Sequence, residues 1–292
     1  MAILPSGAID GVWLDHQYDV RASVEDVDQY LRRYRALSDI ALATYPVHRS
    51  VPYGPGAKET VDIFPAASAG APVFFFIHGG YWRALSKADS AFMVPALTQA
   101  GACVVVVEYD LVPTVDLDGI VQQVRQALAW TYRHVAAFGG DPNRLFAAGN
   151  SAGGHLLGML LSNDWQARLG VSTQILRGAV AISGLFDLQP LMHTFVNEWM
   201  RLSDVDARRN SPLHHVPAQS DTKLLLCYGG LESEAFAHQS AAYLAAWQAM
   251  GLLGESLVSP ERNHFDVVLD LGDTQSAVFK AVHRLMELPG QG

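Results

Sequence analysis

The sequence predicts an α/β fold in which helices cover both faces of a mostly parallel central sheet. Two observations predict it. Short runs rich in β-branched, aromatic and leucine residues recur along the chain, and longer segments with helical spacing of apolar residues separate them. Several of the short runs are apolar throughout, which is typical of strands covered on both faces. The expected strands are residues 61–64, 73–77, 103–108, 145–149, 178–182, 223–228 and 255–258.

The segments between the expected strands carry apolar residues at helical spacing. The expected helices are residues 87–99, 119–137, 153–161, 237–250 and 274–287. Two stretches interrupt this alternation. Residues from about 14 to 50 form a charged, partly helical N-terminal arm. Residues from about 185 to 221 separate two strands and exceed the usual length of a connection in such folds, about 2–6 residues.

The excursion at 185–221 is rich in large apolar side chains, among them Phe186, Phe195 and Trp199. It is expected to be a small lid over a pocket, with Phe186 among the substrate-binding residues. The alternative is a helical excursion that simply packs on the domain. No internal repeat or interdomain linker is visible, so residues 1–292 are expected to form a single domain.

Composition narrows the classes of function. Half of the 292 residues are hydrophobic, and the formal net charge is -9 with 29 acidic and 20 basic residues. Because no run of Lys or Arg is present, binding to nucleic acid or to an anionic membrane surface is not expected. No apolar stretch reaches the roughly 18 residues of a membrane span, and Met1–Pro5 does not begin a secretory signal. The expected location is the cytoplasm.

The two cysteines, Cys103 and Cys227, both lie in apolar runs that are predicted strands. They are expected to be buried and chemically inert, because their spacing resembles neither a disulfide framework nor a metal site. No metal site is expected. The sequence leaves the oligomeric state open, with a homodimer as one expectation.

The strongest chemical signal is Gly149-Asn150-Ser151-Ala152-Gly153, which directly follows a predicted strand and precedes a predicted helix. This G-x-S-x-G pattern in a strand–turn–helix context is the nucleophile elbow of α/β-hydrolases. A sharp turn exposes the serine hydroxyl above the sheet, and the glycines are needed because neighbouring backbone comes too close for side chains. Ser151 is therefore predicted to be the nucleophile, at the positive end of the following helix.

The second signal is His78-Gly79-Gly80-Tyr81-Trp82, which follows the apolar run 73–77. Glycines at the carboxyl end of a strand let backbone amides approach a substrate oxygen, as in the HGGG-type loops of lipases and esterases. The oxyanion hole is therefore assigned to Gly79, Gly80, Tyr81 and Ala152. The alternative is a tight turn without a catalytic part.

The general base should follow the nucleophile and the acid along the chain. Among eleven histidines, His264 lies in a loop between the last predicted strand and the last predicted helix. It is the predicted base. Five other histidines are expected to have structural roles: His78, His155, His214, His215 and His283.

The acid should follow the strand at 223–228, and Glu232 is the predicted residue. A glutamate can orient an imidazole and stabilise its charged form as an aspartate does. Glu234, Asp187 and Asp266 remain alternatives. Each of them could instead be a solvated surface charge or a helix cap.

These motifs together resemble the kynurenine formamidase (arylformamidase) branch of the α/β-hydrolases. The resemblance is carried by 78–82 (HGGYW), 149–155 (GNSAGGH), 51–56 (VPYGPG), 263–265 (NHF), and Glu232 with Phe236, Gln239 and Ser240. It extends from about Tyr18 onward. Two departures are Asn150 before the nucleophile, where histidine is common in the family, and glutamate as the acid, where aspartate also occurs.

The resemblance implies hydrolysis of the formamide of N-formyl-L-kynurenine, with a Ser151–His264–Glu232 triad and no metal or organic cofactor. The expected partner is a small acyl substrate, an aryl formamide or ester. Tyr81 and Trp82 are expected to bind it because they follow the oxyanion turn, although Trp82 could equally be core packing. A carboxylesterase or an amidase for another small acyl substrate is the alternative activity, and a non-catalytic binding protein is a third.

Overall fold

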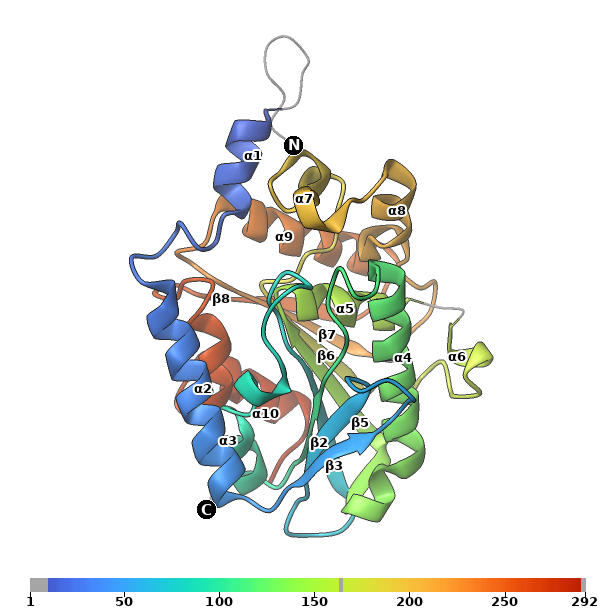
Figure 1. The fold of residues 1–292 in the computed structure, drawn as a ribbon. Coiled ribbons are helices and arrows are strands. Elements are labelled where there is room, and N and C mark those ends of the chain that lie inside the picture. Colours follow the sequence, from blue (N-terminus) through green and yellow to red (C-terminus); the bar gives the residue numbers. More distant parts are fainter. Residues whose placement is uncertain (1–9, 163–164, 290–292) are drawn as a thin grey trace.

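The strands form a single eight-stranded sheet in the computed structural model, which describes residues 10–162 and 165–289 (Figure 1). The order across the sheet is β1-β2-β4-β3-β5-β6-β7-β8. The stretch Met1–Pro5, where no secretory signal is expected, lies outside the described residues. The strands are β1 (His48–Pro52), β2 (Thr60–Phe64), β3 (Ala71–Ile77), β4 (Cys103–Val107), β5 (Gly140–Asn150), β6 (Gly178–Ile182), β7 (Lys223–Gly229) and β8 (Gly254–Ser259).

From β4 across the sheet to β8, each strand pairs in parallel with the next, whereas β2 pairs antiparallel with both β1 and β4. The predicted mostly parallel sheet is therefore confirmed. The sequence prediction missed β1, which was assigned to the end of the N-terminal arm. This strand is an edge strand with mostly exposed side chains, so it lacks the apolar run by which the other strands were found.

Helices cover both faces of the sheet, as predicted (Figure 1). Helices α4 (Leu117–His134), α5 (Ala152–Leu161) and α9 (Glu234–Ala249) follow β4, β5 and β7, and α5 packs on β5 and β6. Helices α3 (Val94–Gln99) and α10 (Ala277–Leu285) meet the 3-10 helix η5 (Val267–Gly272). The predicted helix at 87–99 is divided into η1 (Lys87–Asp89) and α3, which begins anew with Pro95 in its first turn.

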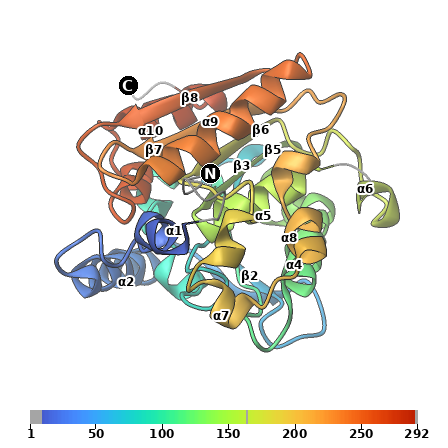
Figure 2. The same cartoon turned by 90° about the horizontal axis from the view of Figure 1, so that it is seen from above.

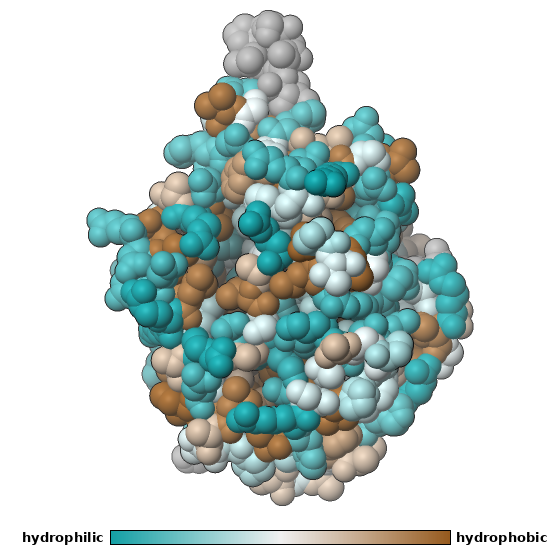
Figure 3. All heavy atoms as spheres, viewed as in Figure 1, coloured by the Kyte–Doolittle hydropathy of each residue, from teal (hydrophilic) through white to brown (hydrophobic). Residues whose placement is uncertain are grey.

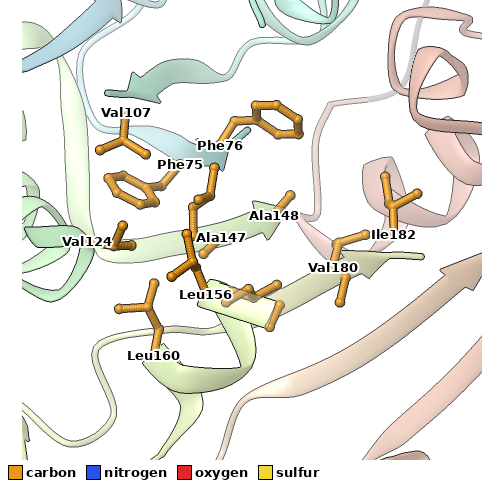
Figure 4. Close-up of a cluster of buried hydrophobic side chains, with 14 of the residues drawn as sticks. Phe75, Phe76, Val107, Val124, Ala147, Ala148, Leu156, Leu160, Val180 and Ile182 are labelled. Atoms are coloured by element: carbon orange, nitrogen blue, oxygen red, sulfur yellow. The ribbon is translucent and has the colours of Figure 1, made fainter. Parts of the chain in front are cut away.

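The core lies between the sheet and its helices. Phe75 and Phe76 are neighbours on β3 and point to opposite faces, as successive strand residues must, and Leu156 of α5 packs on the Phe75 side (Figure 4). All ten residues of α5 are buried. Burying each large apolar side chain contributes about 1.5–3 kcal/mol, so the turn at Ser151, directly before α5, is supported by a well-packed layer. Cys103 and Cys227 are buried in β4 and β7 as free thiols.

The N-terminal arm contains α1 (Gly11–Tyr18) and α2 (Val27–Thr44). Asp10 and Asp26 cap them, accepting hydrogen bonds from the backbone amides of Trp13 and Gln29. Seen from above, α1 lies between α2 and α9, at the end of the molecule where the parallel strands finish (Figure 2).

The excursion after β6 contains short helices: η3 (Pro190–His193), α7 (Asn197–Met200), α8 (Asp204–Arg209) and η4 (Pro212–His214). α7 and α8 lie at the same end of the molecule as α1 (Figure 1). The remaining short helices are η2 (Val135–Phe138), after α4, and α6 (Trp165–Arg168), between β5 and β6. Across residues 10–162 and 165–289, no helix is both long and apolar enough to cross a membrane.

Candidate active site

The predicted catalytic residues follow the carboxyl ends of four parallel strands. The segment at 78–80 follows β3, Ser151 follows β5, Glu232 follows β7 and His264 follows β8. Because parallel strands end at one edge of a sheet, these segments meet even though they are far apart in the sequence. Ligand sites in open parallel sheets lie at this edge.

Ser151 lies in a strained turn between β5 and α5. Its backbone has φ 56° and ψ -118°, a region that costs of order 1–3 kcal/mol for a residue with a side chain. A Cβ added to Gly149 would lie 2.1 Å from the Gly153 carbonyl oxygen, and one added to Gly153 would lie 2.1 Å from the Ile77 carbonyl oxygen. The two glycines are therefore required by close backbone approach, as the pattern predicted.

The hydroxyl, imidazole and carboxylate converge. His264 Nε2 is 3.0 Å from Ser151 Oγ, and His264 Nδ1 is 2.7 Å from Glu232 Oε2. All three side chains are almost fully buried. With the Nδ1 proton directed to the carboxylate, Nε2 is free to accept the serine proton, which is the geometry of a serine hydrolase triad.

The second oxygen of the Glu232 carboxylate is also held. Oε1 accepts hydrogen bonds from the Ser183 hydroxyl at 2.5 Å and from the Gly229 amide at 2.6 Å. A buried carboxylate with both oxygens hydrogen-bonded is fixed in orientation. Ser183 was not singled out by the sequence analysis, although its position directly after β6, beside β7, was a usable signal.

The three alternative acids lie elsewhere. The Asp266 carboxylate accepts from the Asn263 amide, the Asp187 carboxylate accepts from the Gln189 amide, and Glu234 begins α9. Within the described residues, His264 is hydrogen-bonded to the carboxylate of Glu232 and to none of these three.

The glycine turn after β3 lies against the nucleophile. A Cβ added to Gly79 would lie 3.2 Å from Ser151 Cβ, and Gly80 has φ 105° with the Ala84 carbonyl oxygen 2.1 Å from the position of a Cβ. Gly80 and Tyr81 line the same cavity as Ser151. Ala152 is the first residue of α5, so its amide cannot bond within the helix.

His78 supports this turn from the protein interior. It is buried, stacks on Tyr109 with ring centroids 4.2 Å apart, and its Nδ1 lies 2.9 Å from the Gly79 carbonyl oxygen. The Tyr109 hydroxyl donates to the His78 carbonyl oxygen at 2.7 Å. These contacts agree with the structural role expected for His78.

His155 connects the oxyanion turn to the excursion. Its Nδ1 accepts from Trp82 Nε1 at 3.2 Å, so the ring proton is on Nε2, which donates to the Asn210 carbonyl oxygen at 2.7 Å. Burial lowers the pKa of His155 from 6.5 to about 4, against the opposing effect of the Asn210 hydrogen bond. The folded protein thus keeps this imidazole neutral.

The His155→Gln variant is expected to lose part of the acid sensitivity of the fold. Since the folded pKa lies below the unfolded value, His155 contributes stability that is complete above about pH 6.5 and is lost as the pH falls toward 4. A shift of this size corresponds to roughly 3 kcal/mol. Glutamine can accept from Trp82 and donate to Asn210 without titrating.

The measurement is urea unfolding of both proteins at pH 7.5 and 4.5. The wild-type free energy of unfolding should fall by roughly 2–3 kcal/mol more than that of the variant. Equal pH dependence in the two proteins would show that His155 is not a buried neutral group.

A cavity of about 430 Å³ opens at Ser151. Its walls include aromatic side chains from separate parts of the chain: Tyr34 from α2, Tyr81, Phe195 and Trp199 from the excursion, and Phe265 beside the base. Apolar atoms gather in the middle of the face between α2 and α4, where the space-filling view is hollowed (Figure 3). The cavity suits a flat, aromatic ligand.

Two predicted substrate-binding residues are not part of this cavity. Trp82 is fully buried and bonded to His155, and Phe186 is 1% exposed and stacked on Tyr243 at 4.3 Å. The structure does not place either side chain at this cavity, because each ring fills the interior behind the loop that carries it; for Trp82 this agrees with the core-packing alternative. Tyr81, the third predicted residue, does line the cavity.

The N-terminal arm is hydrogen-bonded to the loops that carry His264 and Tyr81. Tyr34 donates from its hydroxyl to the Phe265 carbonyl oxygen, and the Tyr30 hydroxyl accepts from Asn263 at 2.8 Å. The Tyr81 hydroxyl donates to the Tyr18 carbonyl oxygen at 2.7 Å. The arm therefore supports both the base loop and the oxyanion turn.

The arm also closes one side of a second cavity, of about 510 Å³, which is bounded by His264, Phe195 and Glu232. His264 and Phe195 belong to both cavities. The sequence analysis did not place any arm residue at the site, because the polar helices of the arm carry no motif that signals where they dock.

Within the part of the chain that the structure describes, no group of three or more His, Cys, Asp or Glu side chains is placed to hold a metal ion.

Comparison with known proteins identifies relatives of this chain. Residues 61–198 match the family model described as BD-FAE. The chain is 33% identical to a kynurenine formamidase from Salmo salar, over 87% of this chain and 84% of that protein. It is 31% identical to a kynurenine formamidase from Danio rerio, over 91% of this chain and 89% of that protein.

Solved structures agree with the observed fold. A putative thioesterase from Silicibacter sp. superposes with a TM-score of 0.78 at 28% identity, covering 91% of this chain and 97% of that one. Esterase B from Lactobacillus rhamnosis superposes with a TM-score of 0.68 at 18% identity, covering 92% and 96%. The second likeness concerns the fold alone.

Proposed function

This chain belongs to the kynurenine formamidase family of α/β-hydrolases, and from that premise we propose that it hydrolyses N-formyl-L-kynurenine to L-kynurenine and formate. The observation that carries the proposal is the hydrogen-bonded set Ser151, His264 and Glu232, whose serine and histidine line a cavity rich in aromatic side chains. An acyl group as small as formyl needs little space, so the cavity is available to the aryl leaving group.

In the proposed first half-reaction, Ser151 Oγ attacks the formyl carbon while His264 Nε2 takes the hydroxyl proton. The carbonyl oxygen becomes an oxyanion, which the amides of Gly80, Tyr81 and Ala152 stabilise. Removal of one such donor typically costs roughly a hundredfold to a thousandfold in turnover. Gly79 contributes by letting the turn lie close to Ser151.

Collapse of the intermediate breaks the carbon–nitrogen bond. His264 gives its proton to the departing aryl nitrogen, and the formyl group stays on Ser151 as an ester. In the second half-reaction a water gives its proton to His264 and attacks this ester, and formate leaves as the proton returns to Ser151. Glu232 keeps the imidazole oriented and stabilises its charged form throughout.

The excursion is proposed to act as a lid over the leaving group. Two of its residues, Phe195 and Trp199, form part of the cavity wall, and Trp199 Nε1 donates to the Tyr81 carbonyl oxygen at 3.3 Å. This bond joins the excursion to the oxyanion turn. A substrate bound under the excursion is therefore held next to a turn whose position is fixed.

The proposed activity is tested with three substrates. N-formyl-L-kynurenine should be cleaved with a kcat/KM at least about a hundredfold above that of N-acetyl-L-kynurenine, because the larger acyl group must fit beside the turn. Short p-nitrophenyl esters measure the general acyl-transfer capacity of the same triad. A kcat/KM many orders of magnitude lower on the formamide than on the esters would remove the formamidase proposal.

A carboxylesterase or amidase for another small acyl substrate is the second candidate. It is favoured by the likeness to esterase LipQ of Mycobacterium tuberculosis, which is 28% identical over 74% of this chain. The same substrate comparison decides between the two. A cytoplasmic location and a homodimer stay predictions.

A further inference from the structure

The cavity at Ser151 is lined mostly by aromatic and aliphatic side chains, with three charged residues among them, two of which (Arg21 and Arg83) are exposed. The three are Asp19 and Arg21 from the N-terminal arm and Arg83 from the segment after the oxyanion turn. A purely aromatic cavity would hold any aryl group. The charged residues are therefore where the protein can distinguish one aryl substrate from another.

Asp19 and Arg21 are engaged within the protein. Asp19 Oδ1 accepts hydrogen bonds from the amides of Arg21 and Ala22, at 3.1 and 3.0 Å. The Arg21 guanidinium lies 3.6 Å from the Asp28 carboxylate. Both side chains thus have partners that belong to the turn between α1 and α2.

Arg83 is held in place without being neutralised. Its amide donates to the Gly80 carbonyl oxygen at 3.1 Å, and its guanidinium carbon lies 4.2 Å from the centroid of the Trp199 ring. Among the described residues, no carboxylate lies within 4.0 Å of its guanidinium. A guanidinium stacked on an indole keeps its N–H donors directed outward in a planar fork.

The support for this cation is shared with the oxyanion turn. Trp199 donates from its indole to the Tyr81 carbonyl oxygen, so the aromatic platform under Arg83 is fixed relative to the turn that faces Ser151. The guanidinium therefore lies at a defined place on the rim.

We propose that Arg83 is a specificity residue that binds a carboxylate on the leaving group of the substrate. The inference rests on the proposed function, in which the leaving group is an aryl amine carrying an amino-acid side chain. The aryl ring occupies the aromatic cavity, and the carboxylate of the same molecule pairs with the Arg83 guanidinium. The fork geometry of Arg83 suits two parallel hydrogen bonds to a carboxylate.

The test compares N-formyl-L-kynurenine with N-formylkynuramine, which has the same aryl formamide but no carboxylate. In Arg83→Gln the KM for the carboxylated substrate should rise about tenfold to a hundredfold, with the KM for the decarboxylated one unchanged and kcat altered less than threefold. Arg83→Lys should give an intermediate KM, because it keeps the charge and loses the fork.

A matched control is Arg201→Gln. Arg201 follows α7 in the excursion and does not line the cavity, so the substitution removes an arginine charge that is not part of the site. It should leave the KM ratio of the two substrates at the wild-type value. Equal changes for both substrates in Arg83→Gln, or no change for either, would overturn the proposal and leave Arg83 as a packing partner of Trp199.

A second readout separates this inference from the proposed activity. Hydrolysis of p-nitrophenyl acetate is inhibited competitively by whatever occupies the cavity, so the inhibition constants of L-kynurenine and kynuramine can be compared. Arg83→Gln should abolish the preference for L-kynurenine. If the wild type cleaves the ester and not the formamide, the proposed activity fails, while the inhibition ratio still supports or overturns the role of Arg83.

Discussion

Replacing Ser151 by alanine is expected to lower kcat by roughly a millionfold, to the residual rate that the oxyanion donors and substrate binding alone sustain. The reason is that, in the proposed mechanism, the hydroxyl 3.0 Å from His264 Nε2 is the atom that forms the acyl ester. The measurement is kcat on N-formyl-L-kynurenine and on p-nitrophenyl acetate, with circular dichroism to verify the fold. Retention of more than about one per cent of activity would contradict the assignment.

The controls for this variant are His264→Ala alone and the double variant that carries both substitutions. Because the two side chains act as one unit, His264→Ala alone should cost a similar factor, and the double variant should lose little more. Additive losses would mean that the serine and histidine work in separate steps.

The Glu232→Gln variant should show the second-largest effect, a loss of about ten-thousandfold in kcat. A glutamine keeps the size of the side chain and removes the negative charge next to His264 Nδ1. The imidazole is then no longer held in the productive tautomer, nor is its charged form stabilised. The measurement is kcat against pH from 5 to 9, compared with the wild type.

Asp187→Asn is the matched control, since Asp187 also follows a strand at this edge of the sheet but bonds to the Gln189 amide rather than to His264. It should change kcat less than tenfold. Full turnover in Glu232→Gln together with a large loss in Asp187→Asn would make Asp187 the acid.

The sequence predicted the parallel part of the sheet because its strands are buried on both faces and therefore apolar throughout. The positions after those strands were predicted for a related reason. The carboxyl ends of parallel strands meet at one edge, so Ser151, Glu232 and His264 were expected to converge without any knowledge of the loops, and their side chains do lie within hydrogen-bonding distance.

Features that depend on packing between distant segments were not predictable in this way. Trp82 was expected to meet substrate because it follows the glycine turn, but its side chain is fully buried, whereas the adjacent Tyr81 is only half-buried and lines the cavity. The docking of the arm was missed because Tyr34 lies on a polar, partly exposed helix. Its hydrogen bond to the Phe265 carbonyl oxygen joins residues that no local pattern connects.

The most direct test of the account is labelling with a fluorophosphonate probe, followed by mass spectrometry of the digested protein. A phosphonate reacts only with a serine whose hydroxyl is activated by a neighbouring base and whose oxyanion site is in place. If Ser151 is the activated nucleophile, one adduct forms, on Ser151; its formation is slowed by excess N-formyl-L-kynurenine, and it is absent from Ser151→Ala. An adduct on a different residue, or unchanged labelling of Ser151→Ala, would contradict this assignment.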